Sequence, residues 1–267
     1  MEKNSKGNIK RLGKFILILL LFVLVIAILF IGYKLYIFTL VNKVYDSYYE
    51  FLEKDNIHLE AKSTSSAYDG EFVFYELYRN DGKEIITERL KLSNVYEHTQ
   101  VHYRDLSSGD TITQSDMKGW DNILNKDVAQ PTNYSISDGR FETSYSTFLP
   151  IIIRELEYFK NENYTISDKL NIVKYYLNVS LKDINDNGCI VLEFLEGETR
   201  ETIWINKKDY KIVKIENDII KEIYDENSNV TMEKINMKSV FTMDENVVRD
   251  EDIKWIDLTG KTVTILD

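Results

Sequence analysis

The chain has 267 residues, and its 44 acidic residues outnumber its 33 basic residues, which gives a net charge of −11. This balance argues against a nucleic-acid-binding protein and against an electrostatic grip on anionic lipid, because both require basic surfaces. One cysteine, Cys189, excludes an intrachain disulfide.

An uncharged apolar run extends from Phe15 to Tyr33 near the N terminus. Five basic residues precede it: Lys3, Lys6, Lys10, Arg11 and Lys14. A helix of about 19 residues is about 28 Å long, close to the hydrocarbon thickness of a bilayer. The basic residues predict a cytoplasmic N terminus. We expect three parts, which are a basic cytoplasmic N terminus at 1–14, a transmembrane signal anchor at 15–40 and an extracytoplasmic domain at 41–267.

A cleaved signal peptide is the alternative interpretation of this run. Signal-peptide cores span about 7 to 15 residues and end at a small-x-small site. Here the apolar stretch continues past Gly32 to Phe38 without an Ala-x-Ala motif, and no cysteine follows it that could carry a lipoprotein-type anchor. An uncleaved anchor is therefore the expectation.

The charges divide the chain into two unlike parts. Residues 1–34 contain six basic residues and one acidic residue, whereas the remainder contains 27 basic and 43 acidic residues. Many acids lie beside lysines, which is typical of a solvated surface. The wealth of Asn, Lys, Ile and Tyr, with only two prolines, suggests a low-GC bacterium, so the domain would face the cell wall.

An amphipathic helix is predicted directly after the anchor, because apolar residues from Val41 to Leu52 recur at helical spacing. It could lie on the membrane or pack on the domain. Its polar face has a net negative charge, which favours packing.

A period of two begins at Ile57 and predicts strands. The strands 72–79 and 84–92 flank Asp81-Gly82, and the strands 95–104 and 111–114 flank Ser108-Gly109, as in β-hairpins. A stretch of weak helical character, 115–126, and a turn-rich stretch, 128–142, follow. Residues 147–160 form the clearest helix of this part, with Pro150 tolerated in its first turn.

The C-terminal third consists of strands joined by short polar links. They are 172–181, 189–195, 199–206, 211–216, 219–224 and 230–243. Short links leave no room for crossover helices, so the sheet must be antiparallel. The predicted fold class is α+β, with an N-terminal transmembrane helix followed by one strongly curved antiparallel sheet, a half-barrel, with covering helices.

The sequence contains few candidates for chemistry. Residues 183–188 match the start of an EF-hand calcium loop, but a glutamate is absent at its twelfth position, where Phe194 stands. A hairpin with a type I′ turn at Asn187-Gly188 is the favoured interpretation. His98 and His102 would lie about 13 Å apart on a strand, too far to share a metal.

We expect no catalytic, metal or cofactor site in this chain. Cys189 lies in an apolar strand and is expected to be buried. The chain has no Gly-rich phosphate loop, no Gly-x-Ser-x-Gly and no Ser-x-x-Lys motif. The sequence therefore predicts a protein that is not an enzyme.

A family resemblance rests on three features of the sequence. They are the order of the predicted elements, the hairpin-like stretches 201–206 and 210–214, and a lesser match at 247–253. Over residues 42–258 the chain resembles the bacterial LolA/LppX-like lipoprotein-carrier superfamily. The resemblance implies an unclosed barrel whose apolar concave side is lidded by helices and binds acyl chains or lipid-bearing partners. The candidate lining residues are Phe72, Phe74, Trp120, Ile152, Leu156, Phe159 and Trp204, each of which could equally be plain core.

Two functional hypotheses follow from these observations. In the first, the domain binds a lipid, an acyl chain or a lipoprotein in an apolar concavity. In the second, it is an interaction or regulatory ectodomain that recognises another cell-envelope protein and has a filled core. Carriers of the resembled family lose their signal and diffuse, whereas an anchored domain would sense or present its ligand close to its own membrane.

Overall fold

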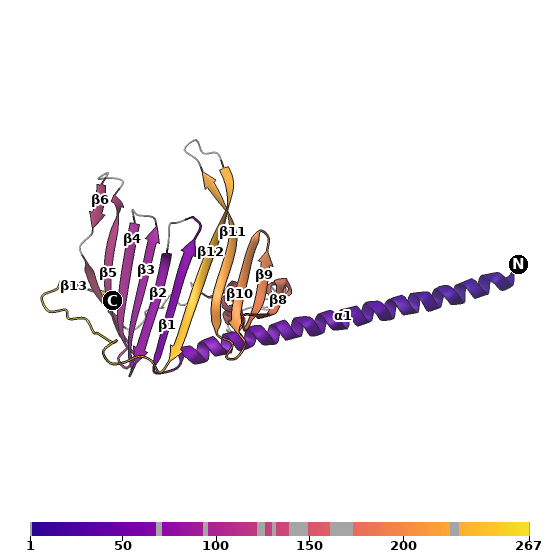
Figure 1. Cartoon of the computed structure of the whole chain (residues 1–267), viewed down its shortest axis with the longest axis horizontal. Coiled ribbons are helices and arrows are strands. Elements are labelled where there is room, and N and C mark those ends of the chain that lie inside the picture. Colours follow the sequence, from indigo (N-terminus) through magenta and orange to yellow (C-terminus); the bar gives the residue numbers. More distant parts are fainter. Residues whose placement is uncertain are drawn as a thin grey trace.

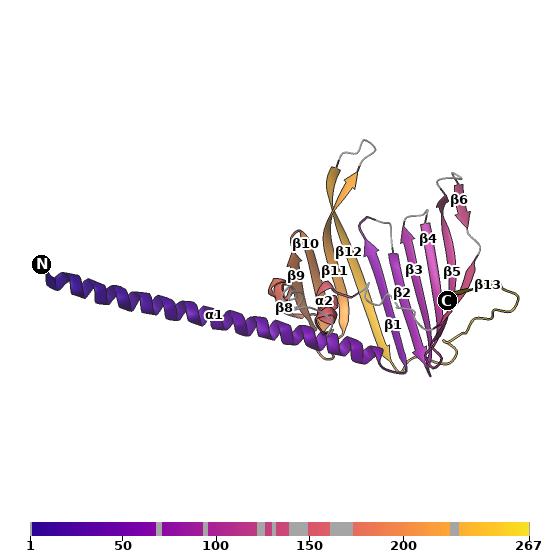
Figure 2. The ribbon, with the colours of Figure 1, turned by 180° about the vertical axis from the view of Figure 1, so that it is seen from behind.

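A computed structural model describes residues 2–67, 71–92, 96–121, 126–129, 132–138, 149–160, 173–224 and 230–266. In these residues a long helix, α1 (Glu2–Leu52), leads into one large β-sheet (Figure 1). A second helix, α2 (Ile151–Lys160), lies on one side of the sheet (Figure 2). Residues 173–178 form a further short helical segment. The chain is therefore of the α+β class.

The strands follow one another with short connections. In chain order they are β1 (Ile57–Ser65), β2 (Glu71–Asn80), β3 (Lys83–Leu92), β4 (Tyr96–Asp105), β5 (Asp110–Asp121), β6 (Lys126–Ala129), β7 (Asn133–Asp138), β8 (Val179–Asp186), β9 (Cys189–Glu196), β10 (Thr199–Asn206), β11 (Ile212–Tyr224), β12 (Val230–Glu245) and β13 (Val263–Leu266).

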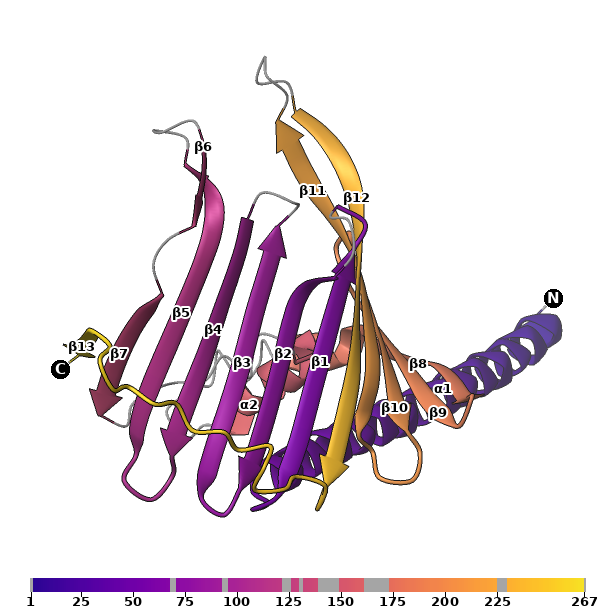
Figure 3. The ribbon, with the colours of Figure 1, turned by 60° about the vertical axis from the view of Figure 1, so that its left-hand side comes forward.

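All of these strands belong to one open sheet with the order β13-β7-β5-β4-β3-β2-β1-β12-β11-β10-β9-β8, and β6 pairs with β5. The pairings are antiparallel, as the short links predict, with the exception of β13, which runs parallel to β7. Residues 246–262 reach β13 by crossing one face of the sheet (Figure 3). We call this the outer face and the opposite one the inner face.

Helix α1 has two unlike halves. Its N-terminal half extends away from the sheet, and its apolar side chains from Phe15 to Ile31 are exposed. Its C-terminal half lies on the inner face, on the same side as α2 (Figure 2). Side chains from Ile37 to Phe51 are buried there in one cluster with Leu59, Leu77 and Ile203. The amphipathic spacing after the anchor thus corresponds to packing on the sheet.

Several element predictions are wrong. Residues 115–126 were expected to have helical character, but residues 115–121 continue β5, which pairs with β4 up to Lys118 and with β6 up to Asp121. The turn-rich stretch 128–142 contains β7. Residues 173–178 are helical where a strand was expected, and the two strands predicted between 211 and 224 are one strand, β11. In β5, β7 and β11 the pairing with neighbouring strands overrides local composition.

The predicted hairpins are confirmed. Asp81 and Gly82 have φ angles of 48° and 71°, and Asn187 and Gly188 have φ angles of 51° and 82°, as a type I′ turn requires. The EF-hand-like residues 183–188 therefore belong to the β8–β9 hairpin. The expectation of a buried Cys189 is wrong, since this residue is half-buried at the first position of β9. The predicted helix 147–160 begins, as α2, at Ile151, and residues 147 and 148 lie outside the described part.

Candidate ligand cavity

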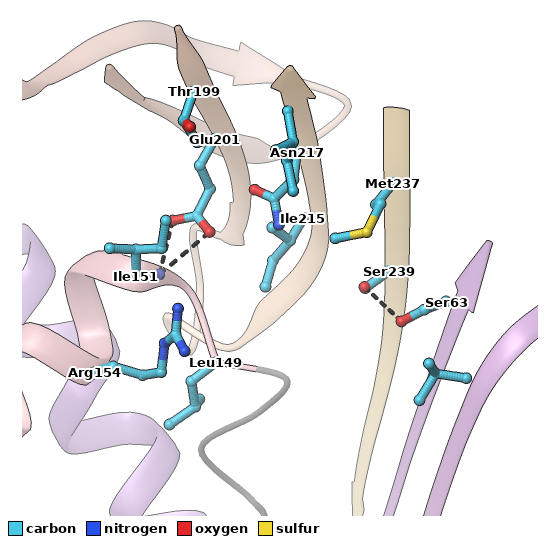
Figure 4. Close-up of a pocket in the computed structure, with 12 residues that line it drawn as sticks. Ser63, Leu149, Ile151, Arg154, Thr199, Glu201, Ile215, Asn217, Met237 and Ser239 are labelled. Carbon is cyan, nitrogen blue, oxygen red and sulfur yellow. Dashed lines mark hydrogen bonds between the residues drawn. The ribbon is translucent and has the colours of Figure 1, made fainter. Parts of the chain in front are cut away.

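A cavity of about 350 Å³ lies between the inner face of the sheet and the first turn of α2 (Figure 4). We call it the α2 cavity. Strands β1, β2, β10, β11 and β12 form its floor, and Leu149 and α2 close one side. Its lining consists of Ser63, Val73, Leu149, Ile151, Arg154, Thr199, Glu201, Ile215, Asn217, Ile219, Met237 and Ser239.

The strand register explains why these residues share one face. Asn217 on β11 lies directly opposite both Glu201 on β10 and Met237 on β12. Two residues further along β12, Ser239 lies opposite both Ile215 and Ser63. Directly opposed residues point to the same side of an antiparallel sheet, with Cβ atoms about 5 Å apart. Two cross-strand rows therefore form the floor of the cavity.

Glu201 lies at the centre of the polar end of the cavity and is only 1% exposed. Its Oε1 and Oε2 accept hydrogen bonds of 2.9 and 3.2 Å from the backbone N–H of Ile151. Ile151 is the first residue of α2, where N–H groups have no partner within the helix. The carboxyl of Glu201 therefore caps α2 and ties it to β10.

Burial raises the pKa of Glu201 to about 7, and the hydrogen bond from Ile151 and the positive charge of Arg154 only partly oppose this shift. At neutral pH the carboxyl therefore exists in both protonation states, so it can donate or accept a hydrogen bond. A strongly shifted carboxyl in a cavity is a feature of functional sites.

Two further polar atoms at this end have no hydrogen-bond partner among the described residues. They are Nε of Arg154 and Oδ1 of Asn217, and both are buried. Buried polar groups in proteins are nearly always paired, so unpaired ones call for an explanation. Here both side chains line the α2 cavity (Figure 4). A ligand with polar atoms could pair with them.

The rest of the cavity is mainly apolar. Its apolar lining residues are Val73, Leu149, Ile215, Ile219 and Met237. The far end carries two hydroxyls that satisfy each other, because Oγ of Ser63 lies 2.7 Å from Oγ of Ser239. The cavity therefore combines an apolar body with one end that carries unpaired polar groups.

Seven residues were predicted to line a concavity, and the structure describes the side chains of four of them, Phe74, Ile152, Leu156 and Trp204. None of these four lines the α2 cavity. Ile152 and Leu156 are fully buried on α2 within the core. Phe74 lies on the outer face, where the guanidinium of Arg89 is 4.9 Å from its ring.

Trp204 also lies on the outer face, with Nζ of Lys214 3.4 Å from its ring centroid and its own Nε1 donating to Asp186 at 2.9 Å. The structure therefore separates Phe74 and Trp204 from Ile152 and Leu156. The side chains of Phe72, Trp120 and Phe159 lie outside the described part of the chain.

Sequence reasoning missed Glu201, Arg154 and Asn217. The sequence does contain a pattern that points to Glu201. On β10 it lies two residues before Ile203 and four residues before Ile205, and both of these are buried. Alternation places all three on one face of a strand. A charged residue at such a position predicts a buried carboxyl. Arg154 and Asn217 carry no comparable pattern.

The two histidines considered for a metal site have local partners instead. Nε2 of His98 lies 2.9 Å from Oγ of Ser115, and Nδ1 of His102 lies 2.9 Å from Oγ1 of Thr113. Burial lowers the pKa of His102 to about 4, which keeps its ring neutral at neutral pH. In the part of the chain that the structure describes, no three His, Cys, Asp or Glu residues come together as metal ligands.

No protein-family model matches the chain, and no curated protein is significantly similar to it. The resemblance to lipoprotein carriers therefore stays a prediction. One helix in the described residues is long and apolar enough to cross a membrane, with the apolar stretch near the N terminus. This finding supports a protein associated with a membrane by a single span.

Proposed function

We propose that this chain is a membrane-tethered, extracytoplasmic, non-enzymatic domain that binds a lipid, an acyl chain or the acyl group of a lipoprotein in the α2 cavity. The observation that carries the proposal is the apolar cavity with unpaired polar groups at one end. In this proposal the sheet acts as a curved half-barrel and α2 as its lid.

The size and chemistry of the cavity support an amphiphilic ligand. Small-molecule pockets measure about 300–1,000 Å³ and are mostly apolar with a few placed polar groups. The α2 cavity, at about 350 Å³, accommodates part of an acyl chain. The Arg154 guanidinium, which is always charged, would pair with a carboxylate, phosphate or ester oxygen of the head group.

The proposed topology rests on the N-terminal sequence. The apolar run of α1 is exposed in the folded chain, as expected for a helix surrounded by lipid. The basic residues before this run favour a cytoplasmic N terminus. The sheet domain, which is acidic, would then lie on the far side of the membrane.

The alternative function, recognition of another envelope protein through the surface, predicts a filled core. The α2 cavity favours ligand binding over this alternative. Only the first function predicts an acyl chain inside the α2 cavity. A photocrosslinking experiment therefore distinguishes the two functions.

The full chain would be placed in lipid nanodiscs with a fatty acid that carries a photoreactive diazirine on its chain. After irradiation, mass spectrometry would locate the crosslinked peptides. We expect crosslinks on β11 and β12, at or beside Ile215, Ile219 and Met237. The variant Ser239→Phe fills the cavity from its floor and should abolish these crosslinks.

The matched control is Val240→Phe. Val240 is the next residue on β12 and, because side chains alternate along a strand, points to the outer face, where it is exposed. This variant should retain wild-type crosslinking. Crosslinks that persist in Ser239→Phe, or that occur only on the apolar half of α1, would contradict the proposal.

A further inference from the structure

Exposed apolar side chains cluster along the β8 edge of the sheet. Leu177 precedes β8 and is 50% exposed, and Ile184 within β8 is 55% exposed. Val173, one helical turn before Leu177, is exposed as well. Figures 1 and 2 show that this edge is the one nearest to the N-terminal half of α1. We call Val173, Leu177 and Ile184 the β8-edge patch.

Helix α1 is fastened to this edge at the point where its uncharged apolar run ends. Nζ of Lys34 donates hydrogen bonds of 2.7 Å to the carbonyls of Leu177 and Val179. The hydroxyl of Tyr33 accepts a hydrogen bond of 2.7 Å from the N–H of Leu181. The backbone groups of an edge strand are normally unpaired. Here α1 satisfies two of those of β8, at Val179 and Leu181, and one carbonyl of the helical segment before it, at Leu177.

A second contact continues the same junction. The rings of Phe38 and Tyr176 lie with centroids 4.9 Å apart. Tyr176 thus contacts Phe38 of α1, and Leu181, five residues later, contacts Tyr33. The segment 176–181 therefore runs toward the N-terminal end of α1. Since α1 is one continuous helix, no flexible linker separates its apolar run from this edge.

These contacts fix the height of the edge above the membrane. Tyr33 is the last residue of the uncharged run, so the N–H of Leu181 lies within hydrogen-bond distance of a residue at the boundary of the hydrocarbon layer. Ile184 is three residues further along β8, or about 10 Å at the rise of a strand. The edge therefore lies within reach of the interfacial layer that surrounds the ~30 Å hydrocarbon core.

We propose that the β8-edge patch contacts the lipid of the membrane in which α1 is anchored, so that the sheet rests on the bilayer by this edge. The proposal needs α1 to span the membrane, but it does not depend on a ligand in the α2 cavity. The transfer of apolar side chains from water to the membrane interface lowers the free energy.

The charges of the edge favour apolar contact over electrostatic attraction. Lys174 and Lys182 are exposed near the patch, but Asp183 is exposed beside them, and Lys182 pairs with Glu193 at 3.2 Å. This mixed set provides no basic cluster of the kind that binds anionic lipid. A zwitterionic lipid should therefore suffice, and salt should have little effect.

Fluorescence quenching tests the proposal in the full chain. The variants Leu177→Cys, Ile184→Cys and Ile265→Cys, each combined with Cys189→Ser, would carry an environment-sensitive fluorophore in phosphatidylcholine vesicles that contain acyl-chain nitroxide lipid. Ile265 is the matched control, because it is 76% exposed on β13, at the opposite edge of the sheet. The two edges are about 50 Å apart along the sheet.

We expect labels at positions 177 and 184 to lose about half of their emission, since they would lie beside the hydrocarbon core, and the label at 265 to lose none. Adding Ser239→Phe should leave this pattern unchanged, so a failure of the lipid-binding proposal would not alter the result. Equal quenching at all three positions, or no quenching at 177 and 184, would overturn the inference.

Discussion

Arg79 and Glu84 form an ion pair across the β2–β3 hairpin, with Nε of Arg79 donating to Oε2 of Glu84 at 2.8 Å. The carboxylate of Glu84 is fully buried, and Arg104 approaches its other oxygen at 3.7 Å. Nη1 of Arg79 also donates to the carbonyl of Leu52, the last residue of α1. Arg79 thus joins the end of α1 to the sheet.

Removal of Arg79 should destabilise the fold strongly. The variant Arg79→Met leaves the buried Glu84 carboxylate without its main partner and the end of α1 without its cap, so we expect the free energy of unfolding to fall by about 3–5 kcal/mol. Urea unfolding of the full chain in detergent micelles, followed by tryptophan fluorescence, measures this change.

The control for this prediction is Arg249→Met. Arg249 also pairs with an acid, Glu251 at 3.2 Å, but both side chains are mostly exposed. We expect its effect to be within about 0.5 kcal/mol. Similar losses in the two variants would show that burial of the Arg79 pair does not matter.

Glu201 should make stability depend on pH. Its pKa rises from the ordinary 4.5 to about 7 in the folded chain. Between these values the folded state holds a proton that the unfolded state has lost, so stability falls as pH rises from about 4.5 through 7. The shift corresponds to a loss of about 3 kcal/mol of stability for the wild type as the pH rises. Glu201→Gln has no titrating group at this position and should not show this loss.

Unfolding free energies measured at intervals from pH 4.5 to pH 8 check this expectation. The difference between Glu201→Gln and wild type should widen in favour of the variant as the pH increases. The control Glu198→Gln changes a glutamate that is exposed in the turn between β9 and β10. If the two variants show the same profile, the cavity carboxyl is not the titrating group.

Arg154 should determine the affinity for anionic amphiphiles. A hydrogen bond to a charged group contributes about 1.5–3 kcal/mol, so Arg154→Met should weaken binding of a fluorescent fatty acid about 10- to 100-fold. Arg154→Lys should restore part of the affinity, since it keeps the charge but lacks the planar guanidinium. Affinity that is unchanged in Arg154→Met would place the head group elsewhere.

Lys34 and Tyr33 should protect the backbone of β8. In the double variant Tyr33→Phe/Lys34→Met the N–H of Leu181 loses its partner, so its amide hydrogen should exchange faster. Hydrogen–deuterium exchange of the peptide that covers 177–182 measures this effect, and the peptide that covers β10 serves as the internal reference. Equal acceleration in both peptides would indicate general destabilisation instead.

The sequence predicts those parts of this fold that depend on local patterns. The hairpins at Asp81-Gly82 and Asn187-Gly188 follow from residues that tolerate positive φ, and β10 follows from the alternation around Ile203. The antiparallel pairing follows from the short links. These features each lie within a few neighbouring residues, which is why composition and periodicity reveal them.

Features that depend on distant pairing could not be predicted in this way. Residues 115–121 form a strand because β4 and β6 pair with them. Strand β13 pairs with β7 only after residues 246–262 cross the outer face (Figure 3). The α2 cavity unites Ser63, Arg154 and Asn217 from three separate parts of the chain. Phe74 and Trp204 were expected to line a concavity, but their strand positions place them on the outer face.

Helix α1 connects the apolar run to the sheet without a flexible linker. Its exposed apolar run and its buried core residues, which begin at Ile37, belong to the same uninterrupted helix. Any tilt or rotation of the apolar run would therefore be transmitted to the whole sheet. A proteolytic cut between Tyr33 and Ile37 would free the domain from the apolar run, but it would also remove Tyr33 from the N–H of Leu181 at the β8 edge.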